Sequence, residues 1–376
     1  MEASEFDTRF GIVPKVLIKT PAYQQFDFVP GEVTFLTGFR GSGKTVLLNY
    51  LYHHLADGWI GVYSTNSSQL IYNLNHQLYR QLGVAKLLSN FQHYVESVNL
   101  FGVGVKFQTS KLDFNSFALL TGLLEYWSMR KPIMIFIDES AVRQPLVDFL
   151  SQYSDLQQMN KQISVVITGI DREIEELKAV GGLTYLVRSN EIRLGLLDRD
   201  EMARQYRSAM GCSVADSYLL ANTCGGYAYG FQLLGKLVSQ CHQRMIDVNS
   251  DMRQLIGKVI DEFKNELFSK VYRAIFVDLK YNQQLALLVV HRLNRGQSLS
   301  GLANMIGMRR QNLNLYLSDL VALKLVEHPS RGQYYYTFSY FDEFVQHIND
   351  PMSGAYVGSL SGDGSWRGLI ESDFMS

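Results

Sequence analysis

The first half of the chain alternates two kinds of hydrophobic pattern. Short apolar runs predict buried strands at residues 32–37, 133–137 and 163–168, and further strands are expected at residues 59–64 and about 191–194. Longer segments with apolar positions at helical spacing predict helices between them, at residues 44–55, 67–82, 114–129 and 145–159. Strands that alternate with helices are typical of βαβ units, so we expect a parallel sheet covered by helices on both faces. Imperfect alternation at residues 98–107 predicts a β-hairpin inserted into this domain.

The strand pattern stops near residue 194, and a different organisation follows. Residues 198–268 are helical in pattern, with breaks at 211–213 and 224–226 where glycines interrupt the apolar spacing. Residues 280–348 start with helices and end in an aromatic, β-rich segment. Residues 351–376 hold five glycines and six serines, a composition typical of a flexible tail. We therefore expect an α/β core over residues 1–195, an all-helical lid over 196–275, a third domain over 276–348 and a flexible tail over 349–376.

The order of elements in the third domain predicts a winged helix. Helices are expected over residues 282–294, 302–306 and 308–323, and two strands joined by a turn at 329–332 follow them. Side chains that suit contacts with DNA bases and phosphates lie early on the last helix and in the turn; these are Arg309, Arg310, Asn312 and Arg331. Residues 292–331 hold six basic and two acidic side chains, a local charge of +4 that favours phosphate contacts. Winged helices also dock proteins, so double-stranded DNA and a protein partner both stay open as ligands.

Composition narrows the class of protein. A chain of 376 residues with 47% hydrophobic and 19% charged residues can bury the cores of two or three domains. The net charge of −1 excludes a uniformly basic nucleic-acid coat protein. The three cysteines have no CxxC spacing, which predicts neither a disulfide framework nor a zinc site. The N-terminus has no signal-peptide pattern, and no apolar run approaches the roughly 20 residues that span a bilayer, so we expect a soluble cytoplasmic protein with no membrane partner.

A glycine-rich loop follows the first predicted strand and opens the first predicted helix. Its sequence, GFRGSGKT over residues 38–45, matches the pattern GxxxxGK[ST] without substitution. Glycines let backbone N–H groups converge on phosphate oxygens, and the N-terminus of the helix adds partial positive charge. Lys44 is expected to reach the β- and γ-phosphates, and Thr45 to offer its hydroxyl to Mg²⁺. The predicted nucleotide-binding residues are Gly38, Phe39, Arg40, Gly41, Ser42, Gly43, Lys44, Thr45 and Val46.

Two carboxylates, Asp138 and Glu139, follow the apolar strand at 133–137 directly, the arrangement called Walker B. A nucleotide with bound Mg²⁺ needs a carboxylate near the metal, and its hydrolysis needs an oriented water. We expect Asp138 to hold the magnesium and Glu139 to polarise the attacking water. The alternative is a strand end that simply turns polar in solvent. The phosphate loop favours the catalytic interpretation, and together the two motifs predict Mg²⁺-dependent hydrolysis of a nucleoside triphosphate.

With two further segments, these motifs resemble the AAA+ superfamily, in particular its Orc-type initiator-like and STAND-like ATPases with a C-terminal winged helix. One segment is VVITG at residues 165–169, similar to the family's sensor 1 strand, in which Thr168 would contact the γ-phosphate or the water. The other is TCGGYAYGFQLLG at residues 223–235, similar to the family's lid motif. The lead-in FGIVP at residues 10–14 also looks like the start of bacterial members. The resemblance covers about residues 10–345 and implies ATP as the nucleotide; no Asn-Lys-x-Asp motif that would read guanine is present.

The chain departs from the family pattern at the base-binding and lid motifs. Lys19 and Thr20 stand where the family often has a Gly-Arg pair that packs on the adenine side. In the lid motif Ala228 replaces the usual proline, and Tyr229 or Gly230 occupies the stretch that carries the sensor 2 arginine. The resemblance therefore implies nucleotide binding more directly than it implies control of hydrolysis through the lid.

The resemblance also implies an arginine finger, a positive charge brought to the γ-phosphate in the transition state, often by a neighbouring subunit. Arg188, just before the last predicted strand, lies roughly where such family members carry one, and Arg172 and Arg193 are alternatives. An ordinary surface arginine is the other interpretation of Arg188.

The preferred hypothesis is an ATP-binding, ATP-hydrolysing protein of the α/β class, with a P-loop parallel-sheet core, an all-helical lid and a winged-helix domain. Its expected cofactors are ATP and Mg²⁺, and its expected catalytic residues are Lys44, Glu139, Thr168 and Arg188. Nucleotide state would reposition the winged helix against DNA or a partner. The rival is a slowly hydrolysing, STAND-like signalling switch that binds protein partners or itself rather than DNA. A pseudoenzyme that only binds nucleotide is a third interpretation.

Overall fold

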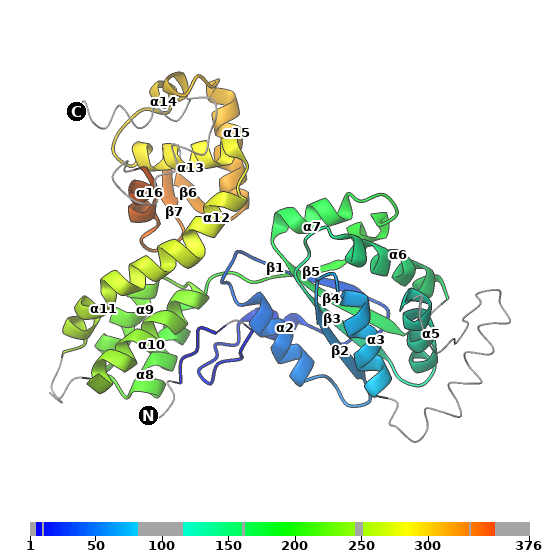
Figure 1. Cartoon of the computed structure of the whole chain (residues 1–376). Coiled ribbons are helices and arrows are strands. Elements are labelled where there is room, and N and C mark those ends of the chain that lie inside the picture. The colour runs from blue at the N-terminus through cyan, green and yellow to red at the C-terminus, as the bar shows by residue number, and fades with distance from the viewer. Residues whose placement is uncertain are drawn as a thin grey trace. The chain divides into compact units, whose positions relative to one another are not determined.

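The computed structural model describes residues 5–9, 11–81, 116–159, 162–244, 251–330 and 332–349 (Figure 1). These residues form two compact units. The sheet unit comprises Arg9–Val13 and Lys19–Gly195, and the helical unit comprises the described residues of Met1–Thr8, Pro14–Ile18 and Leu196–Ser376. The hairpin expected at residues 98–107 and the tail expected from residue 350 onward lie outside the described residues.

The sheet unit is built on a five-stranded sheet, which confirms the predicted α/β core. Its strands are β1 Val33–Thr37, β2 Ile60–Thr65, β3 Ile133–Asp138, β4 Ile163–Gly169 and β5 Asn190–Arg193. Their spatial order is β2-β3-β4-β1-β5, and every pairing is parallel. Because parallel strands end at the same edge of a sheet, the loops that follow β1, β3 and β4 meet there.

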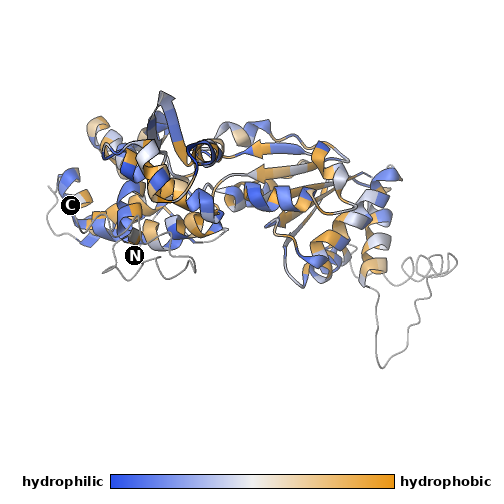
Figure 2. Cartoon of the chain, turned by 90° about the horizontal axis from the view of Figure 1, so that it is seen from above, coloured by the Kyte–Doolittle hydropathy of each residue, from blue (hydrophilic) through white to orange (hydrophobic). Residues whose placement is uncertain are grey.

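Helices cover both faces of this sheet, as Figure 1 shows. They are α1 Pro21–Gln25, α2 Lys44–His53, α3 Leu70–Arg80, α5 Ser116–Ser128, α6 Gln144–Gln158 and α7 Asp171–Lys178. Successive residues of a strand point to opposite faces. Phe35 accordingly joins the core that includes α3, α5 and α6, whereas Leu36 joins the core beneath α1 and α2. Every residue of β1, β3 and β4 is buried, which explains why these three strands read as largely apolar runs. Orange, hydrophobic positions are prominent in the sheet in Figure 2.

The helical unit begins with the helices predicted for residues 198–268. They are α8 Arg199–Met210, α9 Val214–Cys224, α10 Ala228–Arg244, α11 Met252–Leu267, the π-helical turn η2 Phe268–Tyr272 and α12 Arg273–Asp278. Both predicted breaks are confirmed: Gly211 and Gly225 end α8 and α9 in the left-handed conformation that glycine tolerates. Ser213 then caps α9 by accepting a hydrogen bond from the backbone N–H of Asp216. Within the described ranges, no helix has the length and apolar content needed to cross a bilayer.

The C-terminal elements of the helical unit follow in the predicted order of three helices and a hairpin. They are α13 Tyr281–Leu293, α14 Leu299–Met305, α15 Arg310–Ala322, β6 Val326–Ser330, β7 Gln333–Tyr336 and α16 Phe341–Asn349. Ser298 caps the short helix α14 by accepting a hydrogen bond from the backbone N–H of Gly301 at 3.1 Å. The strands β6 and β7 pair antiparallel with an irregularity between Glu327 and Ser330.

The N-terminal segment packs on the helices of the helical unit. The Phe6 ring is buried against Tyr206 and Phe231, with ring centroids 5.6 and 5.7 Å apart. The side-chain amide of Gln232 accepts from the backbone N–H of Asp7 at 3.1 Å and donates to the carbonyl of Val16 at 2.7 Å. One amide on α10 therefore binds two stretches of N-terminal backbone.

This packing differs from the expectation that residues 1–195 all belong to the core. Residues 5–8 and 14–18 lie with the helical unit, and residues 9–13 lie with the sheet unit, where the Gly11 carbonyl accepts from Asn49 Nδ2 on α2 at 2.5 Å. The chain consequently passes between the two units after Thr8, Val13, Ile18 and Gly195. Sequence pattern could not show this, because the contacts of residues 5–18 are made with partners far along the chain.

Candidate nucleotide-binding site

The loop between β1 and α2 depends on glycine at three positions. Gly38, Gly41 and Gly43 have φ values of 144°, 74° and 96°, a range that residues with a Cβ rarely adopt. A Cβ on Gly38 would also lie 2.7 Å from the carbonyl oxygen of Leu194 and 2.8 Å from the hydroxyl of Ser42. The glycines predicted for phosphate binding are therefore required by the backbone of the loop itself.

Lys44, the first residue of α2, turns its ammonium back into the loop. Its Nζ donates to the carbonyl oxygens of Gly38 and Phe39, both at 2.8 Å. Burial lowers the pKa of Lys44 to about 8, and the charge of Arg40 adds to this effect while Asp138 opposes it. A desolvated ammonium held only by neutral carbonyls would gain strongly from an anion, so Lys44 fits a phosphate group.

Two buried hydroxyls in and just before the phosphate loop also indicate that a phosphate group binds there. Thr37 Oγ1 and Ser42 Oγ are buried and have no hydrogen-bond partner among the described residues. Buried polar atoms are normally satisfied, so an unpaired hydroxyl points to a ligand or an ion. A Cβ built on Gly43 would meet no atom within 4 Å, which leaves the backbone at the start of α2 accessible to phosphate oxygens.

The structure brings Thr45, Asp138 and Thr168 together, as the sequence motifs predict. Asp138 is only 1% exposed, and Thr45 Oγ1 donates to its Oδ1 and Oδ2 at 3.0 and 3.2 Å. Thr168 Oγ1 donates to the same Oδ1 at 2.6 Å and accepts from the backbone N–H of Glu139 at 2.9 Å. A hydroxyl beside a carboxylate at the foot of a phosphate loop is a donor set that suits Mg²⁺.

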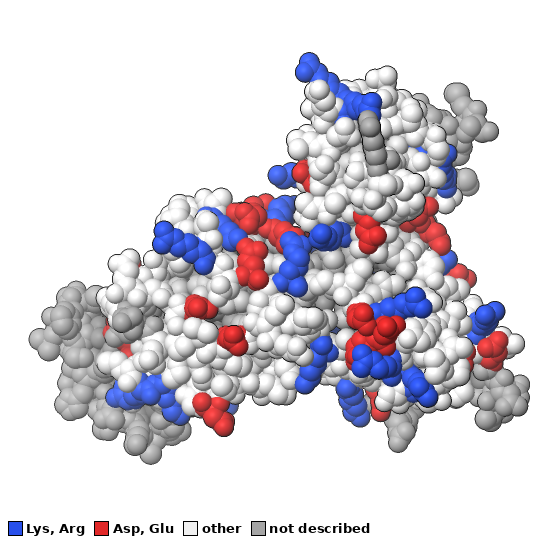
Figure 3. Space-filling view, turned by 180° about the vertical axis from the view of Figure 1, so that it is seen from behind, with Lys and Arg blue, Asp and Glu red and all other residues white. Residues whose placement is uncertain are grey.

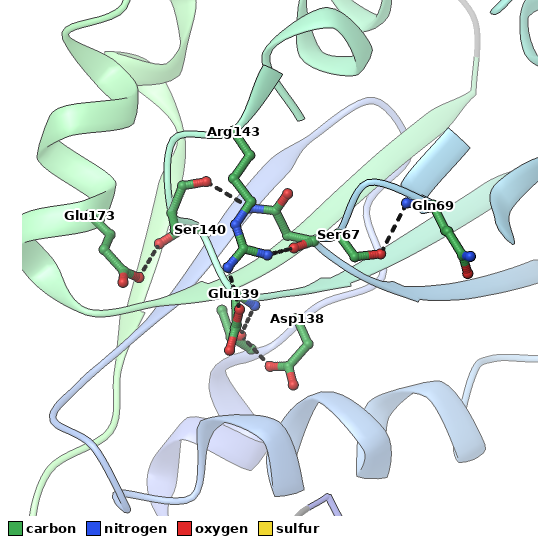
Figure 4. A network of polar contacts seen from close by, with 10 residues as sticks. Ser67, Gln69, Asp138, Glu139, Ser140, Arg143 and Glu173 are labelled. Carbon is green, nitrogen blue, oxygen red and sulfur yellow. Dashed lines mark hydrogen bonds and ion pairs between the residues drawn. The ribbon is translucent and has the colours of Figure 1, made fainter. Parts of the chain in front are cut away.

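Glu139 lies one residue beyond β3 in an unusual backbone conformation. Its φ is 77°, which costs a residue with a Cβ about 1–3 kcal/mol, and the bond from its N–H to Thr168 holds it there. Its carboxylate lies 3.6 Å from Nη2 of Arg143 (Figure 4). Sequence analysis did not find Arg143, because it stands in the short loop before α6 and belongs to no motif.

The loops after β3 and β4 pack closely beside this cluster (Figure 4). Ser140 is fully buried, and its hydroxyl donates to Glu173 Oε2 at 3.3 Å. A Cβ on Gly169 would come within 1.8 Å of that hydroxyl, so only glycine fits directly after Thr168. These three residues were also missed by sequence analysis, although the glycine after Thr168 was part of the segment quoted for its resemblance.

Arg188 lies elsewhere in the sheet unit. It ends the 3₁₀-helix η1 Thr184–Arg188 and is exposed. The first residue of β5, Asn190, pairs with Thr34 near the start of β1, so Arg188 lies at the edge of the sheet opposite the phosphate loop. A role at the site of its own chain is therefore unsupported, and a role at a neighbouring copy stays a prediction. Arg193, at the other end of β5, forms a 2.7 Å ion pair with Asp171.

The residues predicted to contact DNA lie at the start of α15. Arg309 precedes the helix, Arg310 and Asn312 lie in its first turn, and all three side chains are exposed. Arg331 lies outside the described residues. A groove of about 630 Å³ runs between α15 and the β6–β7 hairpin. It is lined by Leu293, Gln297, Ser298, Leu299, Arg310, Asn314, Ser318, Val321, His328, Gly332 and Tyr334.

Comparison with solved structures identifies the fold. The chain is similar to the ORC2 protein of Aeropyrum pernix, solved in ADPNP–ADP complexes, with a TM-score of 0.56, 12% identity, and coverage of 92% of this chain and 89% of that one. It is also similar to a Walker-type ATPase of Pyrococcus abyssi, with a TM-score of 0.50, 13% identity, and coverage of 84% and 91%. No protein-family model and no curated protein sequence matches the chain. The chain thus has the fold of an Orc-type AAA+ P-loop ATPase.

Proposed function

We propose that this protein binds ATP with Mg²⁺ at the loop of residues 38–45 and hydrolyses it. The observation that carries the proposal is the cluster of Thr45, Asp138 and Thr168 at the foot of the loop, linked by hydrogen bonds of 2.6–3.2 Å. The resemblance of the fold to a protein solved with ADPNP and ADP is consistent with it. The assignment of adenine rather than guanine as the bound base rests on the family resemblance. GTP is therefore the appropriate competitor in binding experiments.

The residues divide the chemistry between them. When bound, Mg²⁺–ATP supplies the phosphoanhydride bond to be cleaved, and the metal neutralises charge on its phosphates. Lys44 would exchange its two carbonyl partners for phosphate oxygens, and Thr45 with Asp138 would hold the metal. Glu139 would accept a proton from the attacking water, a role that contributes typically about 10²–10⁴-fold in rate. Thr168 holds both acidic residues in place through its single hydroxyl.

Two substitutions test binding and hydrolysis separately. Lys44→Ala removes charge-assisted hydrogen bonds and should weaken ATP binding at least about tenfold by calorimetry. Glu139→Gln should keep ATP affinity within about threefold and lower turnover by about two orders of magnitude or more. Glu175→Gln, an exposed carboxylate on α7, is the matched control. ATP affinity that is unchanged in Lys44→Ala would contradict the proposal, and turnover unchanged in Glu139→Gln would remove the assigned role.

A second proposal concerns the C-terminal elements, which would act as a winged helix that binds double-stranded DNA. Arg309, Arg310 and Asn312 are exposed together at the start of α15, beside the groove along the hairpin. Figure 3 shows Lys and Arg side chains without acidic neighbours at the outer end of these elements. ATP binding or hydrolysis would then control how these elements meet DNA. The alternative is a slowly hydrolysing switch whose C-terminal elements bind a protein rather than DNA. The DNA-binding test distinguishes the two.

A further inference from the structure

The groove between α15 and the β6–β7 hairpin (Figure 1) is lined on its hairpin side by two stacked rings. The centroid of the His328 imidazole on β6 lies 4.4 Å from that of the Tyr334 ring on β7, and the two planes differ by 7°. Tyr334 is only 9% exposed, whereas His328 is exposed. The accessible end of the stack is therefore the imidazole, which offers a planar surface to another aromatic ring.

The register of the hairpin directs this ring pair into the groove. Glu327 pairs with Tyr335, so the next positions along the two strands bring His328 opposite Tyr334. Successive residues of a strand point to opposite faces, and Glu327 and Tyr335 accordingly do not line the groove. The carboxylate beside His328 in the sequence is thus kept away from whatever the groove binds.

The helical wall of the groove carries polar side chains. Arg310, Asn314 and Ser318 follow one another at four-residue intervals along α15, so they share the face that lines the groove. Among the described residues, no group forms a hydrogen bond with the guanidinium of Arg310 or the carboxamide of Asn314. A carboxamide donates and accepts, as the edges of nucleobases do, and a guanidinium binds phosphate. Gln297 adds a second carboxamide, and the described lining contains no carboxylate.

These features match a single unpaired nucleotide rather than a duplex. The volume of about 630 Å³ lies within the range of about 300–1,000 Å³ that is typical of small-ligand sites. A base inside a duplex is stacked on both faces, so its ring cannot reach His328. An unpaired base exposes both its face and its edge, and proteins that bind single strands stack aromatic side chains on such bases.

We propose that this groove binds one unpaired nucleotide of DNA, with the base stacked on His328, its edge hydrogen-bonded to Asn314 and its phosphate paired with Arg310. The inference rests on the proposed binding of DNA by the C-terminal elements, and it names the form of DNA that they prefer. The chain then binds DNA that contains an unpaired stretch more tightly than a fully paired duplex of the same sequence. A single base stacked on a side chain accounts for a preference of about 5–150-fold.

Fluorescence anisotropy with the full chain tests this preference. Three labelled DNA probes share one sequence: a duplex, a duplex with a central unpaired stretch, and the same unpaired stretch with abasic sites in place of its bases. The unpaired probe should bind at least about fivefold more tightly than the duplex. The abasic probe keeps the flexibility and the phosphates but offers no ring to stack, so it should bind as the duplex does. Equal affinity for the unpaired and duplex probes, or for the unpaired and abasic probes, would overturn the proposal.

Substitutions on the hairpin connect the preference to the groove. His328→Ala should abolish it, whereas His328→Trp keeps a planar ring and should retain it within about threefold. Tyr335→Ala removes an exposed ring that does not line the groove, and it should change nothing. A preference that survives His328→Ala would overturn the assigned site.

A fluorescent base reports the stacking directly. Binding should quench 2-aminopurine in the unpaired stretch for the wild type but not for His328→Ala, and equal quenching by the two would contradict stacking on His328. Failure of every probe to bind at low salt would instead refute the proposed DNA binding, and this inference with it.

Discussion

The hydroxyl of Thr168 donates a 2.6 Å hydrogen bond to Oδ1 of Asp138, and Oγ1 of Thr168 accepts a hydrogen bond from the backbone N–H of Glu139 at 2.9 Å. One side chain on β4 therefore positions both acidic residues at the end of β3. It orients the carboxylate assigned to the metal and fixes the strained backbone of the residue assigned to water. Thr168 is buried, so its hydroxyl cannot be replaced by solvent without rearrangement.

Removal of this hydroxyl should affect both stability and metal use. Thr168→Ala removes one of the two hydroxyls that donate to Asp138 Oδ1 and leaves the backbone N–H of Glu139 without its partner, which should lower the free energy of unfolding by about 1–3 kcal/mol. It should also raise the Mg²⁺ concentration needed for ATP turnover by about 10–100-fold, as for other residues that orient metal ligands. Thr168→Ser keeps the hydroxyl and is the control. Equal Mg²⁺ titrations for the alanine and serine variants would contradict this role.

The lowered pKa of Lys44 predicts that ATP binding is linked to protons. With a pKa of about 8 in the free protein, Lys44 is charged below that pH and increasingly neutral above it. Phosphate oxygens favour the charged form, so binding above about pH 8 must take up a proton, and affinity should fall by up to about tenfold per pH unit.

Calorimetry in buffers of different ionisation enthalpy measures this uptake directly. We expect close to one proton per ATP near pH 9 and almost none near pH 6.5. Lys44→Arg places a group that stays charged at the same position and should bind without the uptake. The same uptake at both pH values, or its persistence in Lys44→Arg, would show that another group titrates.

The Phe6 contact with α10 predicts a steric effect at Gly235. A Cβ built there would lie 2.5–2.7 Å from three atoms of the Phe6 ring. Gly235→Ala should therefore destabilise the protein by about 1–3 kcal/mol in urea unfolding, although alanine is the better helix former. Gly257→Ala on α11 meets no atom within 4 Å and should instead stabilise by up to about 1 kcal/mol. Phe6→Ala should remove most of the difference between the two variants, and a difference that survives it would contradict the proposed clash.

The DNA-binding proposal makes a prediction about salt. Arg309→Ala with Arg310→Ala should weaken binding to double-stranded DNA, and the slope of log affinity against log salt should fall in magnitude by about 2, one for each arginine that no longer neutralises a phosphate. Arg253→Ala, an exposed arginine on α11, is the control and should not change the slope. Fluorescence anisotropy at several salt concentrations measures both quantities. No salt-dependent binding by the wild type would favour a protein partner for these elements.

Sequence predicted those parts of the fold and site whose signal is local. Buried strands are recognisable as apolar runs, and the glycines fix the conformation of the loop at residues 38–45. Asp138 directly follows the apolar run at 133–137, and Thr168 ends the run at 163–168. Their meeting follows from strand order, since β3, β4 and β1 are neighbours. Arg143 was missed because its partners, Glu139 and the Asn66 carbonyl, are set by loop geometry rather than by residue spacing.

Residues 5–8 and 14–18 pack on helices that are synthesised much later, which affects how the chain folds during translation. Asp7 is synthesised 225 residues before its partner Gln232. At a synthesis rate of about 5–20 residues per second, residues 5–18 wait on the order of ten seconds or more before α10 exists to receive them. The sheet unit is then complete while the N-terminal segments destined for the helical unit still lie free, with Phe6, Val16 and Ile18 uncovered. Nascent chains of this protein would accordingly present an apolar N-terminal segment to chaperones until translation has passed residue 235.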